Sequence, residues 1–427
     1  MIRPSRTWRI AAVIGVASLT LAACGGDDPE ETPDATESES SESAAPAAEG
    51  DGELVIGTLL PQTGNLTSLG PQEFAGVQLA VDEINEAGGV LGQPVRKVDS
   101  DSGDATTDIA SQSTDRLLSE GSDVIIGAAS SSVTKTVIDT ITGAGVLQIS
   151  PANTDTTLTD WDDRGLYYRT APSDVLQGAV MGDLLLSDGR VNVGLLVLDD
   201  PYGVSLADAI TETLESGGGA VAGEVIYNPA AAGFSAEVTQ MAGFDADAIV
   251  LIGFITDTAK IIPELAAQGI GPQDVPLYLV DGNIDDYSGD LPDGLLEGSK
   301  ATTPGADSGE EFRQRLLGVD PLLTTFSYGA EAYDATMVAA LAAITAENDS
   351  GEAMGAVLAD VTREGEKCTV FADCVELIEA GTDIDYDGIS GPIEFSDAGD
   401  PTDASIGIYQ YGADNTFTNL EYVQRAI

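Results

Sequence analysis

The chain of 427 residues contains no histidine, and this absence excludes several kinds of site. Without imidazole there is no Ser-His-Asp or Cys-His relay and no His-ligated zinc or haem, so catalysis would depend on carboxylates, Lys, Tyr or a cofactor. Basic residues are also scarce: 17 Lys and Arg stand against 72 Asp and Glu, a formal net charge of −55. Because phosphate binding requires a basic face, we expect no nucleic-acid partner. Hydrophobic residues still make up 43% of the chain, which permits a sizeable core.

Residues 1–24 have the pattern of a secretory signal peptide. Three arginines precede an apolar run, Ile10–Leu21, that is too short to span a bilayer. The run continues as Leu21-Ala22-Ala23-Cys24, which resembles the lipobox of bacterial lipoproteins, where the cysteine thiol receives lipid. Two acyl chains on Cys24 would form a stable anchor, since one chain holds only marginally. We therefore predict an extracytoplasmic protein, lipid-anchored to the cell membrane; the alternative is an ordinary signal peptide with an incidental cysteine.

Residues 25–53 contain eleven acidic and no basic residues, mainly among Ser, Thr, Ala, Pro and Gly. Such a segment buries too little apolar surface to offset its ordering entropy. We expect a disordered, self-repelling tether.

From residue 54 onward, short β-branched apolar runs alternate with segments of helix length. The runs predicted as buried strands are Leu54–Leu60, Val95–Asp99, Val124–Gly127, Val146–Ile149, Val191–Leu198, Val221–Tyr227, Ala248–Gly253 and Leu277–Val280. Repeated strand-helix units predict an α/β fold with parallel sheets and with ligands at the carboxyl ends of the strands. Roughly eight strands exceed one comfortable sheet, so we expect two similar lobes.

Two further features can be interpreted from the residues alone. Cys368 and Cys374 form an even pair in an exported chain, which favours a local disulfide over a redox or metal site. Ser130, Ser131 and Ser132 follow a predicted strand and precede a helix. Hydroxyl and free N–H groups at a helix N-terminus suit a carboxylate ligand, and the alternative is simple N-capping by one serine.

The ordered segments of this region resemble the branched-chain amino-acid-binding proteins of ABC importers, a bilobal type I periplasmic-binding-protein family. The resemblance extends from Leu54 nearly to the C-terminus. It rests on Gly57–Gly64, Phe74–Gly76 with Ile84-Asn85 and Gly88-Gly89, Ile126–Ser132, Ile149–Thr154, Asp200–Gly203 and Tyr386–Phe395. It implies two Rossmann-like lobes with parallel central sheets joined by three crossovers, with the ligand enclosed between them. We expect lobe 1 to comprise residues 54–171 and 302–386, and lobe 2 residues 172–301 and 387–427.

The same resemblance implies a ligand site. The position matching Ser131 binds the α-carboxylate of the ligand, and those matching Ala152 and Thr154 contact both carboxylate and ammonium. An acidic residue after the strand Leu277–Val280 pairs with the ammonium, and here it is Asp281.

The apolar end of the predicted pocket departs from the family. Tyr202 and Phe254 follow strands of the second lobe and would line the pocket; packing within the loops is the alternative, and the family frequently has tyrosine where Phe254 stands. Leu69 stands where the family often places an aromatic over the ligand side chain. One methylene shifts affinity by about 1–3 kcal/mol, so leucine, isoleucine and valine are not separable here.

One motif fits a different chemistry. Asp383, Asp385, Asp387, Gly388 and Glu394 match the spacing of an EF-hand calcium loop. The loop requires an exiting helix, whereas Gly391-Pro392 interrupts it and the following residues have the pattern of a strand. We expect no metal and no cofactor here.

The resulting hypothesis is a monomeric, non-enzymatic, extracytoplasmic receptor that captures a small amino acid, which the resemblance implies is branched-chain, and delivers it to an ABC permease. A sensor of an amino acid or amide without a transport role is the first alternative. An extracellular α/β hydrolase is the second, although no G-x-S-x-G elbow, metal cluster or Walker loop is visible. The acidic excess beyond the tether suits a solvated surface in high salt, where self-repulsion is screened.

Overall fold

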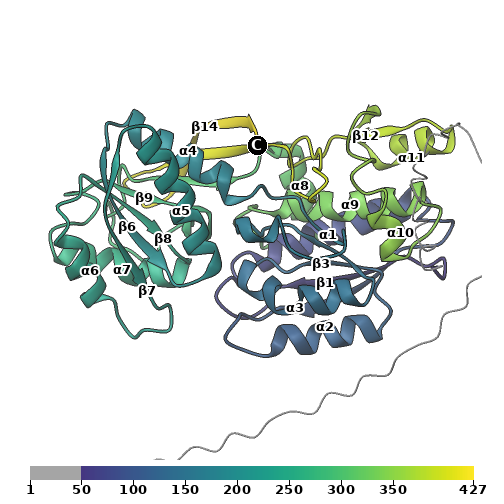
Figure 1. Ribbon diagram of the computed structural model, residues 1–427, viewed down its shortest axis with the longest axis horizontal. Coiled ribbons are helices and arrows are strands. Elements are labelled where there is room, and N and C mark those ends of the chain that lie inside the picture. Colours follow the sequence, from purple (N-terminus) through teal and green to yellow (C-terminus); the bar gives the residue numbers. More distant parts are fainter. Residues whose placement is uncertain (1–49) are drawn as a thin grey trace, which may run out of the picture. The chain divides into compact units, whose positions relative to one another are not determined.

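The computed structural model describes residues 50–427, in which strands and helices alternate (Figure 1). All eight predicted strands are present, with ends that differ by a residue or two from the expected ones. The predicted signal peptide, Cys24 and most of the predicted tether lie outside the described residues. Within residues 50–427, no helix has the length and apolar character needed to cross a membrane.

The first lobe is built on a five-stranded parallel sheet with the order β2-β1-β3-β4-β5. Its strands are β1 (Val55–Leu60), β2 (Arg96–Asp101), β3 (Val124–Gly127), β4 (Leu147–Ser150) and β5 (Tyr167–Arg169). Strands β1, β3 and β4 are buried along their whole length. Strands buried on both faces are rich in apolar residues, which is why these strands were predictable from the sequence, although Thr58, Gln148 and Ser150 are buried among them.

Helices cover both faces of this first sheet. Those of the first lobe are α1 (Gly70–Glu86), α2 (Ile109–Ser119), α3 (Ser131–Gly143), α8 (Gly309–Val319), α9 (Gly329–Thr345), α10 (Gly351–Gly355) and α11 (Phe371–Glu379), with a 3₁₀ turn at Thr156–Leu158. The apolar sides of α1 and α9 pack on one face of the sheet, and α2 and α3 pack on the other. Helices α1 and α9 approach closely at Gly76, where a Cβ atom would lie 2.2 Å from the Gly329 carbonyl oxygen.

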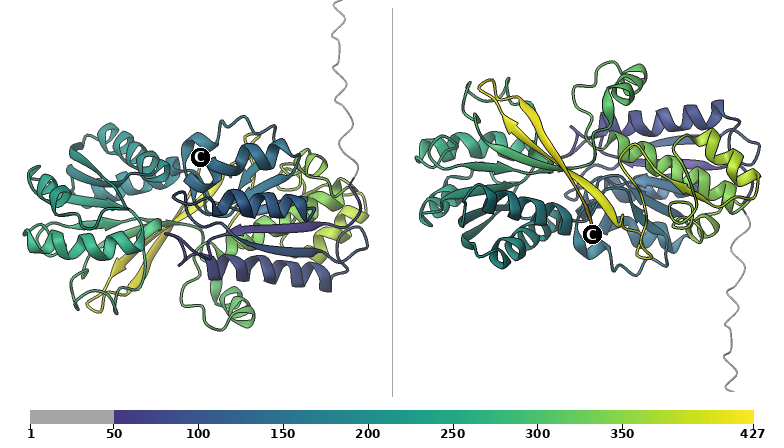
Figure 2. Two further views of the ribbon diagram at one scale, coloured as in Figure 1. Left: turned by 90° about the horizontal axis from the view of Figure 1, so that it is seen from below. Right: turned by 90° about the horizontal axis from the view of Figure 1, so that it is seen from above.

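The second lobe contains a seven-stranded sheet with the order β14-β13-β10-β9-β8-β6-β7. Its strands are β6 (Asn192–Leu198), β7 (Ala220–Tyr227), β8 (Ala248–Ile252), β9 (Leu277–Leu279), β10 (Lys300–Pro304), β13 (Asp403–Tyr411) and β14 (Phe417–Ala426). Its helices are α4 (Asp174–Ser187), α5 (Pro201–Ser216), α6 (Ser235–Ala242) and α7 (Ile255–Ala267), with a 3₁₀ turn, η2 (Asp281–Asn283). Strands β13 and β14 are antiparallel, so this sheet is mixed rather than wholly parallel as expected (Figure 2).

The chain passes between the lobes after β5, after β10 and before β13, as the resemblance implied. The boundaries differ from the expected ones because β10 continues the second sheet to Pro304. Likewise Phe395 belongs to the core of the first lobe, where its ring packs edge-on against Tyr168 at 5.2 Å. The first lobe therefore extends past residue 386, and the third connection lies between Phe395 and β13.

A buried ion pair joins two of these connections. Arg169, whose side chain is wholly buried, donates from Nε to Asp400 Oδ1 at 2.6 Å and from Nη2 to Asp400 Oδ2 at 2.9 Å. Its Nη1 donates to the Asp155 carbonyl at 2.8 Å. A bidentate pair with this geometry holds the end of β5 against the strand entering the second lobe.

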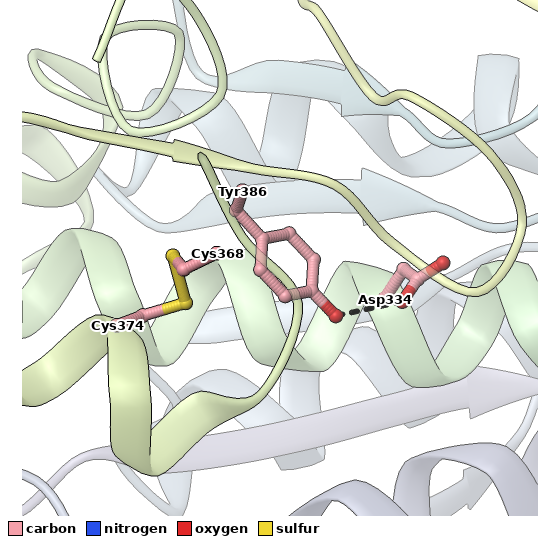
Figure 3. Close-up of a disulfide and its surroundings, with 4 residues drawn as sticks. All are labelled: Asp334, Cys368, Cys374 and Tyr386. Atoms are coloured by element: carbon pink, nitrogen blue, oxygen red, sulfur yellow. Dashed lines mark hydrogen bonds between the residues drawn. A yellow bond between two sulfur atoms is a disulfide. The ribbon is translucent and has the colours of Figure 1, made fainter. Parts of the chain in front are cut away.

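A disulfide joins Cys368 and Cys374, as the sequence predicts (Figure 3). It links a short parallel pair of strands, β11 (Glu366–Cys368) and β12 (Ile384–Tyr386), to α11. Close to it, the Tyr386 hydroxyl donates to Asp334 Oδ1 of α9 at 2.9 Å. The disulfide therefore belongs to the part of the first lobe in which β11, β12 and α11 pack near α9.

Candidate functional site

The predicted ligand-binding side chains all line a single cavity between the lobes. Those from the first lobe are Leu69, Ser130, Ser131, Ala152 and Thr154, and those from the second are Tyr202, Phe254 and Asp281. The free space in the cavity is about 20 Å³, room for about one water molecule. The lobes are thus closed on each other, and a ligand of amino-acid size enters only when they separate.

The N-terminus of α3 forms one wall of the cavity. Ser130 is its N-cap: the hydroxyl accepts from the Val133 N–H at 3.3 Å and lies 2.9 Å from the Ser132 hydroxyl. Ser131 is the first helical residue and is 3% exposed. Because the first N–H groups of a helix lack intrahelical partners, this wall favours an anionic group. The serines therefore combine the capping role with the geometry of a carboxylate site.

The loop after β4 forms the adjoining wall, and Asn153 holds it in place. The Asn153 amide donates to the carbonyl oxygens of Ala128 and Ala129 at 3.0 and 2.8 Å, which ties the loops after β3 and β4 together. Its neighbours Ala152 and Thr154 line the cavity and are 8% and 1% exposed. The Thr154 hydroxyl has no hydrogen-bond partner of normal geometry among the described residues. This wall therefore contains a buried hydroxyl whose hydrogen-bonding capacity is not fully used.

The second lobe contributes two aromatic rings that begin helices. Tyr202 follows the N-cap Asp200 of α5, and Phe254 is the N-cap residue of α7. The two rings stack with centroids 6.0 Å apart and planes at 9°. Both rings are buried, as packing within the loops would require. They also line the cavity, which loop packing alone does not explain.

Asp281 lies at the start of η2, directly after β9 and Val280, and its carboxylate is held by two phenols. Tyr202 donates to Oδ1 at 2.7 Å, and Tyr328 donates to Oδ2 at 2.8 Å. Burial raises the pKa of Asp281, and these hydrogen bonds oppose the rise. Neither Lys nor Arg is among the described residues that line the cavity, so no protein cation is present to pair with this carboxylate there.

Tyr328 is a cavity residue that the sequence analysis did not identify. It belongs to the first lobe and precedes α9, and it adopts a left-handed backbone conformation with φ of 63°. No strand leads directly into Tyr328, so the rule that ligand-binding groups follow the carboxyl ends of strands does not identify it. Its hydrogen bond to Asp281 crosses between the lobes.

Further polar contacts join the lobes beside the cavity. The Thr156 N–H donates to the Ser205 hydroxyl at 3.0 Å, and that hydroxyl lies 3.2 Å from Thr156 Oγ1. Asp200 of the second lobe has a pKa raised by burial, which a hydrogen bond from Ser132 of the first lobe opposes. Closure therefore brings hydroxyl groups of one lobe against acidic groups of the other.

The remaining lining of the cavity is apolar. Leu66 and Leu69 pack against the core of the second lobe, and Leu69 also contacts a small cluster containing Ala129, Ala152 and Tyr328. Together with the two stacked rings, these leucines form a hydrophobic compartment beside Asp281. An amphiphilic ligand, with charged groups at one end and an apolar group at the other, fits this distribution.

The acidic segment with EF-hand spacing has another structure. Residues 384–386 form β12, and Lys367 Nζ lies 3.1 Å from Asp385 and 2.9 Å from Asp387. Within residues 50–427, no group of three or more His, Cys, Asp or Glu side chains is arranged to hold a metal ion.

Comparison with known proteins places the chain in a family. The family model for periplasmic binding proteins matches residues 53–415. The Leu/Ile/Val-binding protein BraC3 of Rhizobium johnstonii is 34% identical over 178 residues, which cover 41% of this chain and 47% of BraC3. The chain thus spans about half the length of that relative. The chemotactic signal transduction system substrate-binding protein BasB of Halobacterium salinarum is 26% identical over 362 residues, 82% of this chain and 84% of BasB.

A solved structure has the same fold over nearly the whole described region. The branched-chain amino acid transporter substrate-binding protein LivJ of Streptococcus pneumoniae, in complex with isoleucine, aligns with a TM-score of 0.71. The alignment covers 88% of this chain and 100% of LivJ at 22% identity. The family is one of solute-binding proteins that act outside the cytoplasm rather than a family of enzymes. On its matched length and its fold, the chain belongs to the periplasmic binding protein family, with the type I fold and with relatives among the Leu/Ile/Val-binding proteins.

Proposed function

We propose that this protein captures a small α-amino acid, branched-chain in type, and delivers it to the permease of an ABC importer. The observation that supports this most directly is the pairing of opposite chemistries across one cavity. The N-terminus of α3 suits a carboxylate, and the buried Asp281 suits an ammonium group. An α-amino acid carries both charges on one carbon atom, and its side chain would then lie in the apolar compartment.

In the proposed cycle, the first lobe holds the ligand and the second lobe closes over it. Ser130 and Ser131 with the first-turn N–H groups receive the carboxylate, and Ala152 and Thr154 contact both charged groups. Asp281 then completes the site as the lobes approach. Closure excludes water and strengthens these interactions, because charges attract more strongly at low dielectric constant. The permease reverses the process by favouring the open form.

The proposed cellular setting follows from the N-terminal sequence. Cleavage before Cys24 and lipidation of its thiol would anchor the protein to the outer face of the cell membrane, and residues 25–53 would act as a tether. The receptor would act as a monomer beside its permease.

A panel of ligands tests the function. Leucine, isoleucine, valine, alanine and 4-methylpentanoate, the leucine analogue without an amino group, are each added at equal concentration to the purified protein. We expect one or more branched-chain amino acids to raise the midpoint of thermal unfolding by several degrees, since ligand at about 1,000 times its Kd stabilises by about 4 kcal/mol. The analogue without the amino group should have little effect. No shift with any amino acid would refute the proposal.

Transport is separated from sensing by a second measurement. The relative BasB is by name a chemotaxis protein, so a sensor remains the competing function. Deletion of the gene should reduce cellular uptake of the amino acid identified in the panel. Unchanged uptake together with lost chemotaxis toward that amino acid would favour the sensor instead.

A further inference from the structure

A second buried carboxyl group lies behind the cavity wall. Asp174 is the first residue of α4 and is 0% exposed. Its N–H donates to the Thr154 carbonyl at 2.7 Å, which places it directly against the loop that lines the cavity. Among the described residues, neither of its carboxylate oxygens has a hydrogen-bond partner of normal geometry. A wholly buried carboxyl group with no partner is costly, and such groups concentrate at functional sites.

The groups around Asp174 do not neutralise it. Asp281 and Tyr202, which belong to the second lobe as α4 does, lie near it, and Asp281 raises its pKa further. The positive charge of Arg169 lowers the pKa of Asp174, but that guanidinium is already held by Asp400 and by a backbone carbonyl. The hydroxyls of Ser205 and Thr154 lower the pKa in part. Burial dominates, and it raises the pKa of Asp174 to about 8.

Thr154 connects this carboxyl group to the cavity. Thr154 lines the cavity, and its buried hydroxyl has no partner of normal geometry but lies near the Asp174 carboxyl group. A hydroxyl that donates to a carboxylate turns its lone pairs the other way. When Asp174 is ionised, Thr154 would therefore present an acceptor, rather than a donor, to the ligand.

We propose that Asp174 is a positioning residue of the amino-acid site: it orients the Thr154 hydroxyl and, with Asp281, makes the closed site select ligands that carry an ammonium group. This inference rests on the proposed function and deepens it. The closed site without a cation buries two neighbouring carboxyl groups, which is unfavourable unless a proton is taken up. An ammonium group supplies the missing charge, so the Asp174 carboxyl group releases its proton to the solvent as the ligand binds. A ligand without an ammonium group leaves that proton in place.

Calorimetric titration with L-leucine provides the test. The titrations are repeated at about pH 7 in two buffers with different enthalpies of ionisation, which measures the protons released per ligand. We expect the wild-type protein to release roughly 0.5–0.9 proton, because a carboxyl group with pKa about 8 is mostly protonated at this pH. In Asp174→Asn most of this release should disappear, and the preference for leucine over 4-methylpentanoate should fall at least tenfold.

A matched variant separates this effect from the loss of any buried carboxyl group. Asp257 in α7 is 3% exposed, its pKa is raised to about 6 by burial, and it does not line the cavity. Asp257→Asn should keep both the proton release and the ligand preference. If Asp174→Asn does not fold, the wild-type protein alone suffices: its proton release should vanish at about pH 9, where Asp174 is ionised before binding.

The outcomes distinguish the two proposals. Leucine binding with unchanged proton release and preference in Asp174→Asn would overturn the role of Asp174 and leave the amino-acid function standing. Wild-type release that persists undiminished at about pH 9 would overturn it as well. A wild-type protein that binds no amino acid would refute both.

Discussion

The two walls of the interlobe cavity are built in different ways. The first lobe presents backbone and small side chains: the start of α3 and the loop around Asn153, which is fastened by hydrogen bonds to carbonyl groups. The second lobe presents a buried carboxylate held by phenols and two stacked rings. The first wall is held by hydrogen bonds within its own lobe, whereas the carboxylate of the second wall also accepts a hydrogen bond from Tyr328 of the opposite lobe. Under the proposed function, this difference would assign recognition of the carboxylate to one lobe and make recognition of the ammonium group depend on closure.

The strongest test of this division removes the charge of the second wall. Asp281→Ala should weaken amino-acid binding by at least tenfold and up to several hundredfold, about 1.4–3.5 kcal/mol, because the ligand ammonium is left buried without a partner. Calorimetric titration measures this change. Asp286→Ala, which removes an exposed acid on the same segment, is the control and should bind normally. Equal affinity in the two variants would contradict the role of Asp281.

A second test breaks the first wall at two adjacent hydroxyls. Ser131→Ala should lower affinity about three- to tenfold, since it deletes one hydrogen bond to the ligand while leaving the helix N–H groups in place. Ser130→Ala should lower affinity as well and should also lower the free energy of unfolding by about 1 kcal/mol, because Ser130 is the N-cap of α3. Titration and denaturant unfolding of both variants check the expectation. If both affect stability alone, the serines act only as caps.

The test with the smallest expected effect removes one hydrogen bond between the two walls. Tyr328→Phe removes the hydroxyl that donates to Asp281 and keeps the ring, so the closed form loses one charge-assisted hydrogen bond between the lobes. We expect a two- to tenfold loss of affinity, expressed mainly as faster ligand dissociation in stopped-flow measurements. Tyr386→Phe loses a comparable buried bond to Asp334, away from the cavity, and should leave the dissociation rate unchanged. Faster dissociation in the Tyr386 variant as well would indicate a general loss of rigidity.

The parts of the fold that could be predicted share one physical property. Strands such as β3 and β8 are buried on both faces, so every residue in them is apolar and the run is visible in the sequence. Strand β14 at the edge of the second sheet is largely exposed, and β13, although mostly buried, has Ser405, Gly407 and Gln410 between its apolar residues, so neither sequence contains a continuous apolar run. They were missed for that reason, and with them the antiparallel edge of the sheet.

The residues of the candidate site likewise divide into those that the sequence pattern could identify and those that it could not. Ser131, Thr154, Tyr202 and Asp281 each follow a recognisable strand, and the carboxyl ends of parallel strands meet at one edge of a sheet. Tyr328 and Asp174 follow no strand of their own sheet, and in a chain with 72 acidic residues a single Asp attracts no attention. Their positions depend on how α4 and the loop before α9 pack against the cleft.

The sequence by itself determined the alternation of strands and helices, the lobes it implies, the pairing of the two late cysteines and the residues at the strand ends. These follow from local apolar periodicity and from spacing along the chain. Only the tertiary structure decided which carboxyl groups lose their water, because burial depends on residues far apart in sequence. In the sequence, Asp281, Asp174 and Glu331 do not differ from the other acidic residues, and burial in the folded chain is the largest cause that raises their pKa values.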